Sequence, residues 1–122
     1  MKPIATPNAP GAIGPYSQGY EFGELIITSG QIPVDPATGE LPQGITAQAH
    51  QSCKNVKAIL EAAGSDMSKV VKTTCFLADM ADFAAFNAVY AEYFVSKPAR
   101  SCVAVREIPK GCLCEIEAIA VK

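Results

Sequence analysis

Two charged residues lie in otherwise apolar stretches near the C-terminal end of the chain. Arg100 belongs to residues 98–105 and Glu115 to residues 112–121, and both stretches have the composition of buried strands. Arg and Glu are rarely buried without a partner. The guanidinium group of Arg also matches a carboxylate, which it binds through two parallel N–H bonds. The two residues therefore predict a site for a small carboxylic acid.

Strand geometry limits how these charges can meet. Side chains alternate between the faces of a strand, so Arg100 and Cys102 share one face, and Glu115 and Glu117 share a face of the second strand. If the two strands belong to one sheet, Arg100 and one of the glutamates reach a common ligand. The spacing does not distinguish the two glutamates. A plain Arg–Glu ion pair that supports an interface is the alternative.

Other residues are weaker candidates for catalysis or ligand binding. His50 is the only histidine, and its place among glutamines in a helical segment is typical of a solvated helix face. Nucleophilic catalysis by a Ser–His or Cys–His pair would require His50, for which the sequence shows no acidic partner. Cys102 is either a nucleophile activated by Arg100 or, more commonly for such a residue, a buried thiol. Tyr16 is either a core aromatic or a phenol directed at a ligand.

A sheet with two helices must position these residues. Helical spacing of apolar residues predicts one helix that ends at Gly64 and a second that Asp82 caps and Pro98 ends. The predicted strands cover residues 17–22, 24–29, 69–78, 98–105 and 112–121. The order β-β-α-β-α-β-β defines an α+β domain with a mixed sheet.

Two segments rich in turn-forming residues flank the first pair of strands. Residues 3–16 are rich in Pro, Gly and Asn, and residues 13–16 are predicted to form a loop. Residues 30–44 are predicted to form a turn-rich excursion of the kind that often borders a site. Gly30 and Gly44 are interpreted as turn glycines. The sequence contains no glycine motif of the phosphate-binding type.

The predicted sheet is apolar on both faces. Residues 25–27 and 75–77 are apolar at consecutive positions, so side chains on both faces require burial. Two helices cover only one face of such a sheet. We therefore expect the other face to contact another subunit.

Composition narrows the function classes. The 122 residues, 49% hydrophobic and 18% charged, predict one globular domain over 1–122. A net charge of -2 and a pI near 5.3, without a basic stripe, argue against a nucleic-acid-binding protein. We expect no membrane span and no secretory signal. Five cysteines without a CxxC pair favour a reducing cytoplasm or organelle matrix and no metal site.

Six segments, in order and at similar spacing, resemble the RidA proteins of the Rid/YjgF family. They are AIGPYSQ (12–18), TSGQIP (28–33), NVKAILEAAG (55–64), VKTT (71–74), PARS (98–101) and EIEAIA (115–120). Each motif alone is unspecific. The ordered set covers nearly the whole chain and is highly specific.

The resemblance implies a chorismate-mutase-like α+β fold of the bacillus type, with a mixed six-stranded sheet and two helices on one face. It also implies a homotrimer with a central barrel and ligand sites between subunits. The implied activity is hydrolytic deamination of enamine/imine intermediates, such as 2-aminoacrylate, 2-iminopropanoate and 2-iminobutanoate, to 2-oxo acids and ammonia. Relatives use no cofactor, so the only implied ligand is the small imino or 2-oxo acid.

The resemblance further implies roles for five residues. Arg100 matches the carboxylate-binding arginine, and Glu115 matches the acid that positions or activates water, so the choice between the two glutamates rests on analogy. Tyr16 and Ser29 match residues that line the cleft. Cys102 matches a position that contributes mainly through its backbone.

Some features depart from this pattern or leave alternatives open. Asn87 matches a recurrent family residue that we interpret as structural. Residues 95–97 form a shorter segment before Pro98 than in many relatives, which often have an aromatic residue there, so the lip of the cleft is expected to be smaller or more open. A non-catalytic sensor of 2-oxo acids is an alternative function. An endoribonuclease or translation inhibitor is less favoured, because the chain has no basic patch and no pair of histidines.

Overall fold

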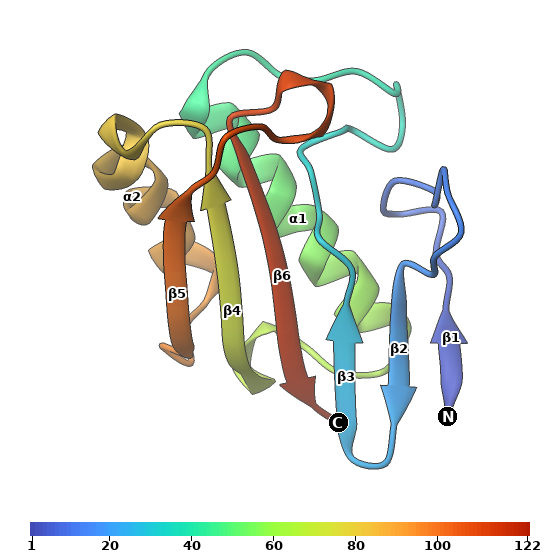
Figure 1. Ribbon diagram of the computed structural model, residues 1–122. Helices are drawn as coiled ribbons and strands as arrows, with labels where there is room; N and C mark the ends of the chain where they lie inside the picture. Colours follow the sequence, from blue (N-terminus) through green and yellow to red (C-terminus); the bar gives the residue numbers. More distant parts are fainter.

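Six strands form one mixed sheet, and both helices lie behind it in the view of Figure 1. The computed structural model describes residues 1–122. The strands are β1 (Lys2–Ile4), β2 (Gly19–Phe22), β3 (Leu25–Thr28), β4 (Val70–Leu77), β5 (Ala99–Ala104) and β6 (Cys114–Val121). The helices are α1 (Ile45–Ala62) and α2 (Phe83–Tyr93). The predicted α+β class, with a six-stranded sheet and two helices on one face, is confirmed.

The order of strands across the sheet is β1-β2-β3-β6-β4-β5. Only β4 and β5 run parallel, joined by the crossover through α2, and the other neighbouring pairs are antiparallel. One strand was not expected, because β1 overlaps a segment whose Pro, Gly and Asn content gives no strand signal. Pro3 is tolerated there because β1 is an edge strand. The order also places β4 between β5 and β6, which decides the geometry of the site.

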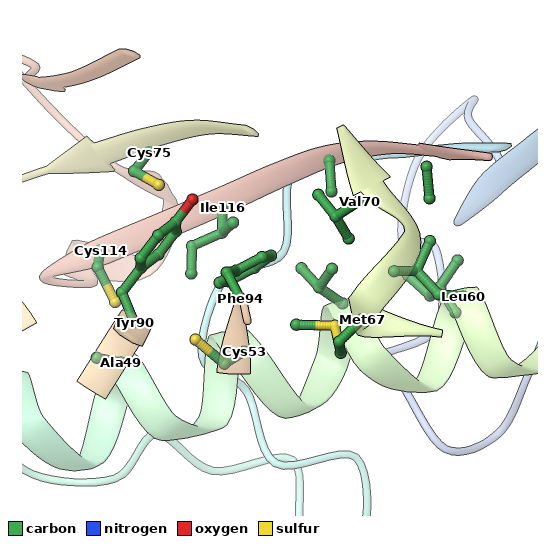
Figure 2. Packing of buried hydrophobic residues seen from close by; sticks show 14 of the residues in the cluster. Ala49, Cys53, Leu60, Met67, Val70, Cys75, Tyr90, Phe94, Cys114 and Ile116 are labelled. Atoms are coloured by element: carbon green, nitrogen blue, oxygen red, sulfur yellow. The ribbon is translucent and has the colours of Figure 1, made fainter. Parts of the chain in front are cut away.

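The apolar stripe predicted for the first helix faces the sheet. Ala49, Cys53, Val56 and Leu60 are fully buried, and Figure 2 shows three of them against side chains from α2 and the sheet. Burying a large aliphatic side chain completely stabilises the fold by about 1.5–3 kcal/mol. The helix ends before Gly64, whose φ of 82° lies in the left-handed region that glycine adopts without strain.

The second helix begins differently from the prediction. Asp82 occupies the N-cap position, but its side chain makes no capping hydrogen bond. The short 3-10 turn Met80–Asp82 runs directly into α2, so Asp82 has φ −86° and ψ 0° instead of the extended backbone that a capping side chain needs. Asp79 caps this turn by accepting a hydrogen bond from the N–H of Ala81 at 2.8 Å. Neither helix combines the length and apolar character needed to cross a lipid bilayer.

The two faces of the sheet differ in burial. Along β6, Cys114, Ile116 and Ala118 are buried against the helices, whereas Glu115 and Glu117 on the opposite face are only half-buried. We call this opposite side the open face. The prediction that two helices cover only one face is confirmed, since both lie on the same side of the sheet (Figure 1).

Buried amide side chains hold the loops at one end of the sheet. Gln18 donates from Nε2 to three carbonyl groups within residues 6–10 and accepts a hydrogen bond from a backbone N–H there at 2.7 Å. Asn55 in α1 donates from Nδ2 to the carbonyls of Ile32 and Val34, at 3.1 and 3.0 Å. Since a buried amide is stable only when its polar atoms are paired, these contacts fix both loops relative to the core.

Candidate functional site

Arg100 extends from β5 toward α2, where three side chains hold it. Its Nη1 donates a hydrogen bond to Asn87 Oδ1 at 2.8 Å. The guanidinium carbon lies 4.7 Å from the ring centre of Tyr90 and 5.5 Å from that of Phe83. Residues 83, 87 and 90 follow helical spacing and therefore share one face of α2. This arrangement holds the cation by cation–π contacts and one hydrogen bond.

The ring beneath the guanidinium is itself fixed. The hydroxyl of Tyr90 and Thr73 Oγ1 of β4 are 2.7 Å apart, within hydrogen-bond distance. The ring of Tyr90 stacks on Phe94 with centroids 4.3 Å apart. Both Tyr90 and Thr73 are buried, so the support for Arg100 is part of the hydrophobic core. The guanidinium is thereby held in a defined position before any ligand binds.

The guanidinium has no carboxylate partner within the chain. The only ion pairs within 4.0 Å are His50–Glu92 and Lys122–Glu21. A guanidinium has five N–H donors, and one of them is used by Asn87. Arg100 therefore forms no ion pair with a glutamate of its own chain and retains donors for an external anion. An Arg–Glu ion pair across an interface stays a prediction. An open hollow of about 560 Å³ lies beside it.

Glu115 lies on the open face and is half-buried. A Cβ atom added at Gly30 would come within 2.6 Å of Glu115 Oε2, so this close approach requires glycine. Gly30 is therefore not the turn glycine that we predicted, and its φ is not in the left-handed region. Burial raises the pKa of Glu115, and the neighbouring negative charge of Glu117 raises it further. The carboxyl group is thus less acidic than usual, as a proton acceptor working near neutral pH requires.

Tyr16 and Ser29 lie on the same side of the site as Gly30. Ser29 Oγ donates a hydrogen bond to the carbonyl of Ser17 at 2.5 Å, which joins the end of β3 to the N-terminal loop. Tyr16 is 50% exposed, so its ring is not a core aromatic. Tyr16 and Gly30 both line a second hollow, of about 250 Å³. The predicted residues therefore form two sets. Arg100 belongs to the first, and Glu115 with Tyr16 and Ser29 to the second.

The two sets lie on opposite faces of the sheet. Arg100 pairs with Thr73 and Glu115 pairs with Phe76, on the two sides of β4. Paired residues share a face, whereas Thr73 and Phe76 are three residues apart and point to opposite faces. Strand spacing and rise place the two Cα atoms about 14 Å apart. The expectation that Arg100 and Glu115 reach one ligand within a single sheet is therefore wrong. Their partners on β4 are an odd number of residues apart, so the two side chains point to opposite faces.

Cys102 shares the face of Arg100, as alternation predicted, and packs against the edge of the core. Burial raises the pKa of its thiol, and the opposing effect of Arg100 is smaller. The interpretation as a buried thiol is favoured over that of an activated nucleophile.

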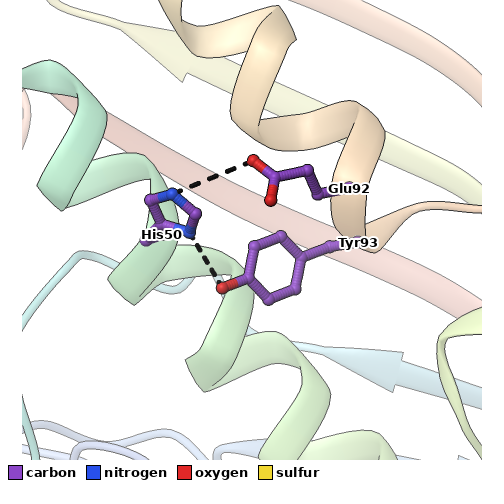
Figure 3. Close-up of polar contacts among 3 residues, drawn as sticks. All are labelled: His50, Glu92 and Tyr93. Atoms are coloured by element: carbon purple, nitrogen blue, oxygen red, sulfur yellow. Dashed lines mark hydrogen bonds and ion pairs between the residues drawn. The ribbon is translucent and has the colours of Figure 1, made fainter.

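His50 does have an acidic neighbour, which the sequence did not reveal. Its Nε2 atom is 3.9 Å from Glu92 Oε2, and its Nδ1 atom is 3.0 Å from the hydroxyl of Tyr93. Figure 3 shows both contacts as dashed lines. The three side chains join α1 to α2. His50 lines neither of the two hollows, and its side chain is 35% exposed, which agrees with the predicted solvated helix face.

Sequence reasoning missed the direct supports of Arg100. The sequence indicates only a structural role for Asn87 and does not connect Phe83 or Tyr90 with Arg100. The signal was present in their spacing, since a polar amide between two aromatic residues on one helix face is suited to hold a cation. No group of three or more His, Cys, Asp or Glu residues is arranged to hold a metal ion.

Fold and site describe a small α+β protein with a guanidinium that α2 holds in place and that has no acidic partner in the chain. The sequence model of the endoribonuclease L-PSP family matches residues 6–122, and the chain belongs to this family.

Individual relatives match over the full length. A 2-iminobutanoate/2-iminopropanoate deaminase of Escherichia coli (strain K12) is 58% identical, with 99% of this chain and 98% of the relative covered. The crystal structure of the YjgF gene product from E. coli is 56% identical and has a TM-score of 0.97, covering 100% of this chain and 99% of the other. The crystal structure of E. coli TdcF with bound serine is 50% identical and also has a TM-score of 0.97, with the same coverage. The resemblance to the RidA proteins is confirmed.

Proposed function

We propose that this chain is a hydrolytic deaminase of small 2-imino acids and their enamine tautomers, acting without a cofactor. The observation that carries the proposal is the 58% identity, over 99% of the chain, to a 2-iminobutanoate/2-iminopropanoate deaminase. The unpaired guanidinium of Arg100 supports it, because every such substrate has a carboxylate next to the imine carbon. The five free cysteines support a reducing cytoplasm as the compartment.

The complete site is formed between copies of the chain in a homotrimer with a central barrel, of the chorismate-mutase-like type. One copy contributes Arg100 and the backbone at Cys102, and its neighbour contributes Glu115, Tyr16 and Ser29. Two observations support this arrangement. Arg100 and Glu115 lie on opposite faces within one chain, and the open face leaves apolar side chains of the sheet without a covering layer.

In the proposed reaction Arg100 binds the substrate carboxylate through two N–H bonds and so orients the imine carbon toward a water molecule. Glu115 accepts a proton as the water oxygen bonds to C2 and passes it to the nitrogen, which gives a carbinolamine. Glu115 then takes the hydroxyl proton and returns it to the nitrogen as the C=O bond forms. The C–N bond breaks, and the products are the 2-oxo acid and ammonia, with no change in oxidation state. A positioned acid–base group contributes about 10²–10⁴-fold to the rate.

Placement on opposite faces also keeps the two groups from pairing within one chain. A guanidinium beside Glu115 within one chain would lower the pKa of the carboxyl group and occupy the donors that bind substrate. In this chain Arg100 is not among the groups that influence the pKa of Glu115, which burial raises. The proton acceptor Glu115 therefore lies on one face of the sheet, and the carboxylate-binding Arg100 lies on the other.

Mixed assemblies test the proposal most directly. Arg100→Ala and Glu115→Ala should each lose activity in an assay of ammonia release from 2-aminoacrylate generated in situ. If each site takes its two residues from different copies, co-expression of the two variants restores activity in about a quarter of the sites. No activity in the wild type would overturn the deaminase proposal. Activity in the wild type without any restoration would overturn the shared site.

A non-catalytic sensor is the second candidate, and one observation favours it. The related TdcF structure contains bound serine, which has a carboxylate but no imine. A sensor would bind 2-oxobutyrate through Arg100 without accelerating ammonia release, so calorimetry together with the ammonia assay distinguishes the two functions. We do not extend the proposal to RNA cleavage, because the only histidine lines neither hollow.

A further inference from the structure

The hollow beside Arg100 contains a second cationic group. Its eight lining residues include two cations, Arg100 and Lys97, one amide, Asn87, and no acid. We propose that Lys97 acts as a specificity residue and that the site accepts imines with a second, side-chain carboxylate, as derived from acidic amino acids. This inference rests on the deaminase function proposed above and names a substrate class for it.

Charge is the first argument. Neither Lys97 nor Arg100 has an acidic partner within 4.0 Å, so both charges are available to a ligand. The floor between them includes the rings of Tyr90 and Phe94, which have low polarity. Two like charges at a cleft with apolar walls produce a positive potential that attracts a dianion more strongly than a monoanion.

The backbone at Lys97 gives the second argument. Its φ of 51° lies in the left-handed region, which few residues other than glycine adopt. The N–H of Lys97 donates to the carbonyl of Phe94 at 3.1 Å, and Ser96 Oγ donates to the carbonyl of Val70 at 2.7 Å. The short segment before Pro98 is therefore tied to both α2 and β4. The base of the lysine side chain is fixed at the edge of the hollow, and only its long stem moves.

Size is the third argument. Ligand sites for small molecules have volumes of about 300–1,000 Å³, and the hollow at Arg100 measures about 560 Å³. A four-carbon imino acid bound by its carboxylate to Arg100 would leave part of this space unfilled. A side chain that ends in a carboxylate extends into that space, toward the second cation.

Two substrates of similar backbone test the inference. We would generate 2-iminoglutarate from glutamate and 2-iminobutanoate from 2-aminobutyrate with flavin-dependent amino-acid oxidases, and follow hydrolysis against trapping by semicarbazide. For Lys97→Gln, the ratio of kcat/KM for 2-iminoglutarate to that for 2-iminobutanoate should fall about 3- to 5-fold, the effect of one partly exposed ion pair. Lys97→Glu should lower the ratio about 10-fold or more, and 0.5 M salt should reduce both effects to within about 2-fold.

A lysine elsewhere on the surface provides the matched control. Lys57 lies on an exposed position of α1, so Lys57→Gln and Lys57→Glu should leave the ratio unchanged. An unchanged ratio in Lys97→Glu would overturn the inference even if the wild type hydrolyses both imines.

The inference also has a readout that needs no turnover. If the wild type hydrolyses neither imine, the proposed deaminase function fails, and calorimetry with 2-oxoglutarate and 2-oxobutyrate still measures the preference for a dianion. Tighter binding of 2-oxoglutarate that weakens in Lys97→Glu supports the second cation. Equal affinities in the wild type and Lys97→Glu overturn it.

Discussion

The two sets of site residues are built in different ways. Arg100 is held by side chains of regular elements, with Asn87 and Tyr90 on α2 and Thr73 on β4 behind them. Glu115 also lies on a strand, but Gly30, whose close approach leaves room for its carboxylate, lies outside the strands. The binding cation therefore depends on the core, whereas the proposed proton acceptor depends on loop placement.

Their electrostatics differ as well. The guanidinium keeps free donors, while the carboxyl group of Glu115 is half-buried and has a raised pKa. If both groups lay on one face, they would form an ion pair, neutralise each other and lose these properties. Opposite placement within a chain therefore keeps the proton-accepting carboxylate and the carboxylate-binding cation from pairing before copies assemble.

Glu115→Gln should lower kcat about 10²–10⁴-fold with little change in KM, because the amide cannot accept the proton from water. Steady-state kinetics of ammonia release measures this effect. Glu117→Gln is the matched control, since Glu117 lies two residues further on the same face of β6. Equal losses in both variants would show that Glu115 has no special role.

Gly30→Ala should lower kcat about 10- to 100-fold, because its new Cβ atom would meet Glu115 Oε2 at 2.6 Å and displace the carboxylate. Gly11→Ala is a suitable control, because no atom lies within 4 Å of the Cβ position there and its φ is not left-handed. Urea unfolding should accompany the kinetics, so that a loss of kcat at nearly unchanged stability is separated from unfolding. Full activity in Gly30→Ala would show that the reaction does not depend on the close contact between Gly30 and the Glu115 carboxylate.

Tyr90→Phe should raise KM about 3- to 10-fold with a smaller change in kcat, because it removes the contact with Thr73 that fixes the ring under Arg100. Thr73→Val should have a similar effect, and the double variant should add little to either, since both changes remove one contact. KM for the substrate and a double-mutant cycle provide the measurement. Additive effects of the two changes would show that Tyr90 and Thr73 do not act through the one contact between them.

The pH profile should show the smallest effect. Glu115 must be deprotonated to accept a proton, so a raised pKa moves the acid limb of kcat/KM to higher pH than for an ordinary glutamate. Removing the neighbouring charge in Glu117→Gln should move that limb back toward lower pH. Lys122→Gln, which removes a charge paired with Glu21, should leave the limb in place.

Much of the fold followed from pattern, and much of the site followed from resemblance. Helical periodicity identified the buried stripe of α1, and the strand from 69 to 78 matched β4 within a residue at each end. The short strand β1 was missed, because three residues at an edge give no periodic signal. Resemblance supplied the role of Glu115, but neither approach identified Tyr90 as a support for Arg100.

The sequence by itself determined the α+β class, the single uncovered face of the sheet and the pair of charges that suggested a carboxylate site. These properties depend on composition and on local periodicity, which each segment carries alone. Only the tertiary structure decided that Arg100 and Glu115 lie on opposite faces. Strand order and register are set by contacts between segments far apart in the chain. Because β4 lies between β5 and β6 and pairs with each in a fixed register, Arg100 and Glu115 point to opposite faces of the sheet.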